Sequence, residues 1–459
     1  MLAPDSINRV AKMWMDDGSV SSYDEALEKL RGFRIGLSVG REVTHSRPLQ
    51  AALLTAVATT TRYCHGGVYV AGLESRPGTT NCSAVTNVSQ LVADLGGSLV
   101  ERLPEDAPCL AFGTIDTMAN RIGLQVTFDG WRAGVLPLED RARLPESGMM
   151  TPAGVAAGAL AASELFQLFR GREVACQRQL GLSLWRPETS SRWKDEDKSE
   201  PQVTHLPANY WLIGLGHLGQ AYAWTISLLP YPTCEKARMV VQDADHVTEA
   251  NESTGLLSSV AVRGFRKTRL MANWLEQQSF LDVAIVERRF KNDFKIQDDE
   301  PLLALCGVDN MDSRRMLEHP GFARIVEAGL GNTADDALKI RVHSFPGTRT
   351  ARHVFEETAD CAATERHLQR TRSQPAYRSM EAGQQLDGCG LDQLAGVSVG
   401  IPFVGATASA LVIAESIRMA MGEQHHDVID VNLASPEAAR AVLAPPAAPT
   451  NIGRIAVVP

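Results

Sequence analysis

Short apolar runs alternate with longer polar or amphipathic stretches along the chain, a pattern typical of α/β proteins built on parallel strands. The clearest case is YWLIGLGHLGQAYAW at 210–224, where an apolar strand meets three closely spaced glycines and a predicted helix follows. Glycines at such a turn let the backbone approach phosphate groups. The stretch therefore predicts a phosphate-binding turn near the middle of the chain.

The two halves of the chain repeat this pattern. RGFRIGLSVGREV at 31–43 resembles NYWLIGLGHLGQA at 209–221, and PAGVAAGALAASE at 152–164 resembles PFVGATASALVIAE at 402–415. The segments at 152–164 and at 402–415 are each followed by another apolar strand. We therefore expect an α/β fold of two tandem Rossmann-like domains that arose by duplication. Two unrelated domains with the same strand-to-helix pattern are the alternative.

Charged, proline-containing sequence separates the halves at 185–209 and predicts a linker. The expected organisation is a first domain at 1–190, a linker at 191–208 and a second domain at 209–459. Inside the second domain, the polar stretch at 347–396 is too long for an ordinary connection. It predicts a mobile crossover loop or a small insertion.

Composition narrows the class of protein. A chain of 459 residues exceeds one ordinary core, and 44% hydrophobic with 22% charged residues is typical of soluble globular proteins. The net charge of −9 argues against a nucleic-acid or membrane partner, and the start of the chain lacks a signal-peptide pattern. Eight scattered cysteines without a CxxC pair fit a reducing compartment. We expect a cytoplasmic protein.

The glycine turn alone is a weak signal, because dinucleotides and ATP both use it; its glycines are Gly214, Gly216 and Gly219. The residues that follow are more specific. Asp243 ends the next strand, where an acid can bind ribose hydroxyls, and Lys267 and Asp309 come later. A lysine neutralises phosphate charge and a carboxylate holds Mg²⁺ between phosphates, whereas a dehydrogenase needs neither. The sequence therefore predicts ATP, with Mg²⁺ at Asp309.

These residues together resemble the ubiquitin-activating and ThiF/MoeB-type adenylating family. The family pattern is G-x-G-G-x-G, then D-x-D-x-V-x-x-x-N-x-x-R, G-x-x-K and D-N-x-x-x-R. The sequence matches it, in order, with Gly214, Gly216, Gly219, Asp243, Asp245, Val247, Asn251, Gly264, Lys267, Asp309, Asn310 and Arg314. The resemblance implies that Asn251 also contacts the nucleotide. For Arg314, stabilisation of its helix or pairing with a carboxylate is the favoured interpretation.

The first half retains only Gly36 and Gly40 of this pattern, and we expect it to be an inactive, degenerate adenylation domain. An inactive half fused to an active half is the arrangement of eukaryotic ubiquitin-activating enzymes. Activating enzymes of bacterial ubiquitin-like conjugation operons, including the antiphage Bil type, have the same form, and the sequence resembles these most. With the degenerate half included, the resemblance covers nearly the whole chain.

The resemblance implies ATP-dependent activation of the C-terminal carboxylate of a small ubiquitin-like protein that ends in a free glycine. The carboxylate would form an acyl-adenylate, then a cysteine thioester, and then pass to a downstream conjugating enzyme. A thiolate suits this step because it attacks readily and leaves easily. Family members often place the cysteine before AGV-x-x-P, which favours Cys389; Cys361 and the absence of a catalytic cysteine are the alternatives.

The sequence departs from the family pattern in two places. Thr254 stands where the family has an arginine, and the candidates to replace it are Arg263, Arg266 and Arg269. His217 stands where glycine is usual. The family also lends an arginine from an N-terminal helix of the opposite domain, and NRVAKMW offers Arg9 and Lys12 for this role. A solvent-facing helix charge is the alternative for both.

Other functions remain open. Within the same chemistry, the acceptor could be a sulfur-carrier protein or a peptide precursor, although the missing CxxC pairs and the fused inactive half disfavour the sulfur carrier. An NAD-dependent oxidoreductase would use the same glycines. An inactive binding scaffold is the third alternative, because of the departure at Thr254.

Overall fold

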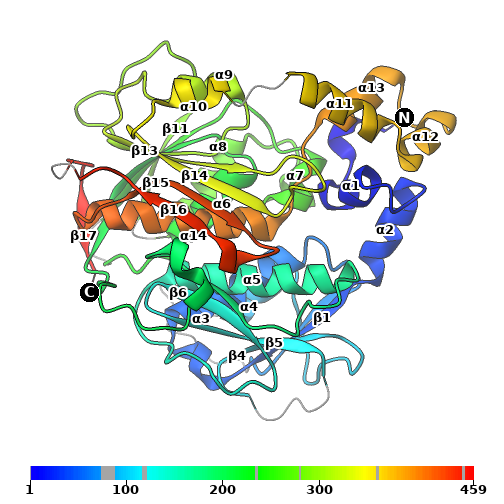
Figure 1. The fold of residues 1–459 in the computed structure, drawn as a ribbon, viewed down its shortest axis with the longest axis horizontal. Coiled ribbons are helices and arrows are strands. Elements are labelled where there is room, and N and C mark those ends of the chain that lie inside the picture. Colours follow the sequence, from blue (N-terminus) through cyan, green and yellow to red (C-terminus); the bar gives the residue numbers. More distant parts are fainter. Residues whose placement is uncertain are drawn as a thin grey trace.

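The computed structural model describes residues 2–73, 88–115, 121–232, 236–278, 281–357, 361–446 and 450–458, without the side chains of 357 and 361–364. It contains two large sheets, one in each half of the chain. In Figure 1 the first sheet lies below in blue to teal and the second sheet lies above it, while the N-terminal helix α1 (Arg9–Asp16), in dark blue, lies at the upper right. The expected α/β class with parallel sheets is confirmed.

The first sheet has the order β3-β2-β1-β4-β5-β6-β7. Strands β3, β2, β1, β4 and β5 run parallel to one another, and β6 and β7 are antiparallel to their neighbours. Its strands are β1 (Arg34–Val39), β2 (Gly67–Ala71), β3 (Ser98–Leu99), β4 (Cys109–Phe112), β5 (Gly123–Asp129), β6 (Arg132–Pro137) and β7 (Leu180–Ser183).

The second sheet has the order β11-β10-β9-β12-β13-β14-β15-β16. Strands β11, β10, β9, β12 and β13 run parallel to one another, and β14, β15 and β16 are antiparallel to their neighbours. Its strands are β9 (Asn209–Ile213), β10 (Ala237–Gln242), β11 (Leu281–Val286), β12 (Leu303–Cys306), β13 (Arg324–Leu330), β14 (Lys339–Phe345), β15 (His426–Asn432) and β16 (Arg440–Leu443). Apart from β16, order and direction repeat those of the first sheet, as a duplication would produce.

The main helices also correspond between the halves. In the first half they are α3 (Arg47–Thr60), α4 (Val88–Asp94) and α5 (Thr151–Phe169), and in the second α6 (His217–Ser227), α8 (Lys267–Glu276) and α14 (Pro402–Ala420). The first helix of each set follows the central strand β1 or β9. These pairs agree with the internal similarity seen in the sequence.

Helices α3, α5, α14 and α6 pack together where the halves meet, between the two sheets (Figure 1). Gly154 and Gly158 let α5 approach α3 closely, since a Cβ at either position would clash with the carbonyl oxygens of Pro48 and Ala52. Helices α5 and α14 are long and apolar enough to span a membrane, but 89% and 100% of their apolar windows are buried. They are core helices.

The linker predicted at 191–208 is packed against the first half. Glu200 accepts the Trp131 N–H (2.9 Å), and Trp131 Nε1 donates to Pro201 O (2.8 Å). The short helix η3 (Pro187–Arg192) precedes this segment, and β8 (His205–Pro207) ends it by pairing with β17 (Ile455–Val457). Polar composition predicts a linker but does not reveal this docking.

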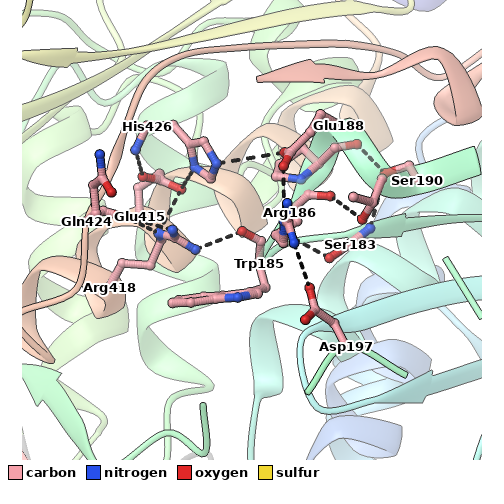
Figure 2. A network of polar contacts seen from close by, with 12 residues as sticks. Ser183, Trp185, Arg186, Glu188, Ser190, Asp197, Glu415, Arg418, Gln424 and His426 are labelled. Carbon is pink, nitrogen blue, oxygen red and sulfur yellow. Dashed lines mark hydrogen bonds and ion pairs between the residues drawn. The ribbon is translucent and has the colours of Figure 1, made fainter. Parts of the chain in front are cut away.

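Figure 2 shows a polar network that joins the end of α14 to the end of the first half. Buried Glu415 accepts both the backbone N–H of His426 and its Nδ1–H (2.7 Å each). Arg418 donates to Trp185 O (2.7 Å) and lies 3.7 Å above the Trp185 ring. Glu188 and Arg186 (3.2 Å) extend the network along the surface.

Glu164 on α5 is the counterpart of Glu415. It accepts hydrogen bonds from Cys176 N–H (3.2 Å) and from Arg178 (2.7 Å), and Arg178 also donates to Ala434 O in the other half (3.0 Å). Each half therefore sends an arginine to a carbonyl of its neighbour. The junction repeats the duplicated pattern down to its hydrogen bonds.

The segment predicted as a crossover loop at 347–396 is mostly helical. It forms α10 (Ala351–Glu357), α11 (Cys361–Arg372), α12 (Pro375–Ala382) and α13 (Gly388–Gly396). Apolar residues at helical spacing are buried on α12 and α13, namely Ala376, Tyr377, Met380, Leu391, Leu394 and Ala395. Of the two predicted alternatives, the small insertion agrees with these helices and the mobile loop does not, because abundant charge hides the apolar periodicity. We call 351–396 the helical insert.

The N-terminal helices dock on the helical insert (Figure 1). The Tyr377 hydroxyl donates to Asp16 Oδ1 (2.6 Å), and Asp16 Oδ2 pairs with Lys12 Nζ (2.5 Å). Leu2 N–H donates to Gln385 O (2.8 Å). The remaining short elements are η1 (Pro4–Ser6), α1 (Arg9–Asp16), α2 (Tyr23–Gly32), η2 (Arg41–Thr44), α7 (Glu249–Thr254), η4 (Val260–Val262), α9 (Met311–Arg315) and η5 (Pro436–Ala438).

Candidate functional site

The candidate site lies at the carboxyl edge of the second sheet. Ile213 at the end of β9 is in register with Gln242 of β10 and with Cys306 of β12. The segments that leave these three strands therefore meet at one edge. The chain order reverses between β9 and β12, and ligands of doubly wound sheets bind at such a switch point.

The three predicted glycines do different things at this edge. Gly214 has φ +80°, which disfavours a side chain, and a Cβ on Gly219 would clash with the Gly214 carbonyl oxygen. A Cβ on Gly216 would meet no atom of the described residues within 4 Å. Gly216 also precedes the first turn of α6, whose backbone N–H groups attract anions. The turn is tight at Gly214 and Gly219 and open at Gly216.

Asp243 fastens the glycine turn to the end of β10. Its Oδ2 accepts the Leu215 N–H (2.7 Å) and its Oδ1 accepts the Asp245 N–H (2.8 Å). Both carboxylate oxygens are thus engaged by the backbone. The ribose contact predicted for Asp243 remains a prediction, to which the structure adds a role in shaping the turn.

Lys267 lies beside the exit of β10. Its backbone N–H donates to Asp245 O (3.0 Å), and its Nζ lies 3.6 Å from Asp245 Oδ2. The Lys267 side chain is 12% exposed, whereas that of Asp245 is 57% exposed. Lys267 therefore presents a charge at the carboxyl edge with a weak, solvated partner.

Asp309 lies on the other side of the glycine turn. It is exposed and follows β12 by three residues, after Cys306, Gly307 and Val308. The next residue, Asn310, caps α9 by accepting the Ser313 N–H (3.0 Å). The structure thus brings Lys267 and Asp309 to the same sheet edge, from strands on either side of β9.

Arg314 is held away from the edge. It forms a buried ion pair with Glu327, donates to Ala328 O (3.2 Å) and lies 4.7 Å from the centre of the Phe355 ring. Burial lowers the pKa of Arg314, and nearby Cys306, Tyr222 and Asp309 raise it. The expectation that Arg314 pairs with a carboxylate is confirmed.

Asn251 lies in the first turn of α7. Its Oδ1 accepts the backbone N–H (2.9 Å) and the hydroxyl (3.2 Å) of Thr248, which completes a helix cap. The predicted nucleotide contact would therefore fall to its amide nitrogen. Asn251 positions α7 whether or not it contacts the nucleotide.

Arg9 lies where the family arginine is missing. Its backbone N–H donates to Ser253 Oγ (2.9 Å), next to Thr254, and its Nη2 pairs with Asp5 (3.2 Å). Nη1 is buried and has no hydrogen-bond partner among the described residues. Burial lowers the pKa of Arg9, against the charges of Asp5 and other neighbours. Arg9 is a candidate from the sequence, but no pattern in the sequence predicts its contact with Ser253, next to Thr254.

The other proposed replacements for the family arginine are paired with carboxylates. Arg263 pairs with Glu252, while Arg266 (3.7 Å) and Arg269 (2.9 Å) pair with Glu287. Lys12, the other N-terminal candidate, is fully buried against Asp16. The alternative of a solvent-facing helix charge is therefore wrong for both Arg9 and Lys12.

His217 begins α6 directly after the turn. Burial lowers the pKa of His217 to about 4, so the imidazole is neutral at neutral pH. This suits a helix N-terminus, where a positive charge is unfavourable. The ring lies against Gly405 of α14, where a Cβ would clash with it. Glycine at 405 makes room for histidine in place of the family's glycine.

Cys389 is the exposed one among the five cysteines whose side chains are described. It is the second residue of α13, whose first turn is capped by Asp387 (2.7 Å to the Gly390 N–H). The buried cysteines are poor nucleophiles, because burial raises the pKa of Cys306 to about 11 and of Cys109 and Cys176 to about 12. Cys361 begins α11, and its side chain lies outside the described residues.

The same edge of the first sheet carries a carboxylate. Glu42 Oε2 accepts the Thr114 N–H (3.1 Å), and a Cβ on Gly40 or Gly113 would approach this oxygen to 2.7 or 2.8 Å. Partial burial raises the pKa of Glu42, but its hydrogen bonds with Thr114 lower it overall, so the group is ionised. A negative charge thus lies at the switch point between β1 and β4.

Comparisons with known proteins agree with the duplicated architecture. Residues 34–184 match the family model described as BilD N-terminal domain, and residues 206–423 match the one described as BilD C-terminal domain. The Bacterial E1-like protein BilD of Collimonas sp. (strain OK412) is 38% identical over 426 residues, which cover 92% of this chain and 90% of that protein.

Solved structures are more distant. Crystal structures of E. coli MccB, with succinimide and alone, align with TM-scores of 0.33 and 0.32 at 10% and 12% identity. The alignments cover 53% and 54% of this chain and 65% of the MccB chain, which is less than two thirds. At these TM-scores the alignments establish no relation to MccB.

Proposed function

The chain belongs to the BilD family of bacterial E1-like proteins, and from that premise we propose that it activates a small ubiquitin-like protein. Its C-terminal half would use ATP to adenylate the partner's C-terminal carboxylate, and Cys389 would then take the acyl group as a thioester. The thioester would pass to a downstream conjugating enzyme in a bacterial, antiphage Bil-type pathway. The first half would bind no nucleotide.

One observation carries this proposal. Lys267 and Asp309 flank an open glycine turn at the switch point of the second sheet, whereas the same edge of the first sheet holds Glu42. A cation and an acid around a turn of free N–H groups suit a triphosphate with its metal. A fixed carboxylate repels phosphate.

In the adenylation step, the partner's carboxylate attacks the α-phosphorus and pyrophosphate leaves. The carboxylate is ionised already, so no general base is needed. The protein contributes position and charge: the N–H groups after Gly216 and the Lys267 ammonium stabilise charge that develops on the phosphates. Asp243 keeps the turn in shape, and the ribose hydroxyls would lie near it.

Asp309 would hold Mg²⁺, which supplies further charge neutralisation on the phosphates when bound. Magnesium is typically bound by one or two carboxylates together with phosphates and water, so an isolated exposed acid beside the turn fits. The described residues contain no cluster of three metal-ligating side chains, which agrees with a metal that arrives with the nucleotide.

Arg9 would add a charge from the N-terminal helix. Its backbone N–H donates to Ser253 of α7, next to Thr254, and its buried Nη1 has no hydrogen-bond partner among the described residues. We therefore propose that Arg9 replaces the family arginine missing at Thr254. The N-terminal segment would then serve the active half, although it lies at the opposite end of the chain.

The thioester step needs an accessible thiol. The Cys389 thiolate attacks the acyl carbon of the adenylate and AMP leaves. Its exposure on α13 supports this role. Because Cys389 lies on the helical insert and not at the sheet edge, we expect the insert and the bound carrier to approach each other between the two steps.

Pyrophosphate exchange into ATP, measured in the presence of a small ubiquitin-like protein that ends in glycine, tests the proposal. Asp309→Asn and Lys267→Ala should each reduce exchange by roughly a hundredfold or more. Asp312→Asn is a matched control, because that exposed acid lies three residues further on and pairs with Arg315. Full exchange activity in Asp309→Asn would refute the metal assignment.

A further inference from the structure

A cavity of about 530 Å³ is lined by residues of both halves, and neither the glycines of the turn nor Lys267 or Asp309 is among them. The first half contributes the end of α3 and of α4, including Arg62 and Leu95. The second half contributes the loop after α7, including Leu256 and Ser258, and Trp274 of α8. This volume is that of a small-molecule site, and its walls mix polar with apolar groups.

Arg62 brings an uncompensated positive charge to this cavity. Among the described residues its guanidinium makes one hydrogen bond, from Nη2 to Leu256 O (2.9 Å), and no ion pair. Its Nε is buried without a hydrogen-bond partner there. Burial lowers the pKa of Arg62 to about 10, although the charge of Glu252 acts in the opposite direction. A cation taken from water without a counter-ion is costly, and an anion beside it would remove that cost.

Trp274 adds a flat aromatic wall to the cavity. Its Nε1 is buried without a partner among the described residues. Its ring stacks on Trp224 at 5.8 Å and 19°, and Trp224 Nε1 donates to Thr55 in the first half (2.9 Å). The wall is therefore fixed across the junction. Asp94 is the acidic side chain among the lining residues.

The loop that closes the cavity is held from behind by Gln220. Gln220 Oε1 accepts the Leu257 N–H (3.0 Å), and its Nε2 donates to Ser258 Oγ (2.9 Å). Gln220 is fully buried on α6 and follows the last glycine of the turn by one residue. These hydrogen bonds fix the loop that lines this side of the cavity.

We propose that this cavity binds a small organic anion with an aromatic or apolar body, which bridges the two halves. A carboxylate or phosphate group would pair with the Arg62 guanidinium, and the body would lie against the Trp274 ring. The site is separate from the glycine turn and does not depend on the adenylation proposed above.

Calorimetry with phenyl phosphate and phenylacetate tests this site on the full chain. We expect one of the two anions to bind, which identifies the favoured acid group, and benzyl alcohol to bind much more weakly. Arg62→Gln should weaken binding by roughly tenfold or more, the effect of losing a charge-assisted hydrogen bond. Arg102→Gln, at an exposed arginine of the same half, should leave it unchanged.

Two further variants make the result decisive. Trp274→Leu removes the aromatic ring against which the body would lie, so it should weaken binding even if Arg62→Gln fails to fold. Lys267→Ala should retain full binding, because its side chain lies at the other site. The proposal is overturned if neither anion binds, if Trp274→Leu and Arg62→Gln bind as tightly as the wild type, or if Lys267→Ala abolishes binding.

Discussion

At the scale of single residues, similar side chains in the matched motif have different surroundings. Asp243 and Asp309 both follow buried strands, yet the oxygens of Asp243 accept backbone N–H groups while Asp309 is exposed. Arg314 is committed to buried Glu327. Sequence spacing predicts which residues come to the edge, because the strands are parallel and in register. It does not predict how each polar atom is used.

Cys389 and Cys361 are distinguished by a trapping experiment. Cys389→Ala should keep pyrophosphate exchange and lose the thiol-sensitive covalent adduct with the partner, because adenylation precedes transfer to sulfur. Cys361→Ala is the matched variant on the neighbouring helix and should retain the adduct. If the adduct disappears in Cys361→Ala and persists in Cys389→Ala, the assignment is reversed.

His217 makes folding stability depend on pH. Its pKa is about 4 in the folded chain and ordinarily 6.5, so between these values the unfolded chain binds a proton that the folded chain does not. Stability should therefore fall as pH drops from 6.5 towards 4, by about 1.4 kcal/mol per pH unit for this group. Denaturant unfolding of His217→Gln at several pH values should give an unfolding free energy that falls less steeply with decreasing pH, by that amount per pH unit. An unchanged slope would mean that His217 is protonated in the fold.

At the scale of elements, apolar periodicity was a good guide where an element is buried on all sides. Strand β9 and helices α5 and α14 fall in apolar stretches of the sequence and are buried along nearly all of their length. It failed for the helical insert, whose helices bury one face only and expose many charges. The docking of α1 on the insert, through Asp16 and Tyr377, joins segments 361 residues apart and leaves no local signal.

Tyr377→Phe tests this docking. The change removes the hydroxyl that donates to Asp16 and leaves that buried carboxylate with Lys12 alone, at a cost of about 1–3 kcal/mol. Amide hydrogen exchange in α12 and α13 should become faster by roughly ten- to hundredfold. Tyr69→Phe is a control, since among the described residues its hydroxyl bonds Gly66 O (3.2 Å) in the first half and no residue of the insert. Equal exchange in both variants would show that the insert is held by other contacts.

At the scale of the whole molecule, the two halves share one topology and differ in chemistry. The sequence predicts the repeat, because the same strand–glycine and small-residue helix patterns recur. It shows that the first half lacks most glycines of the turn, but it does not predict that Glu42 lies at the equivalent sheet edge. Nor does it predict the cavity between the halves, which depends on how surfaces far apart in the chain meet.

The most direct test of the central claim is equilibrium binding of ATP with Mg²⁺ to the full chain, measured by calorimetry. We expect one site per chain, lost in Lys267→Ala and unchanged in Glu42→Gln, since only the second half would hold a triphosphate. NADH should not compete. Binding that survives Lys267→Ala, or displacement of ATP by NADH, would contradict the assignment of the glycine turn to ATP.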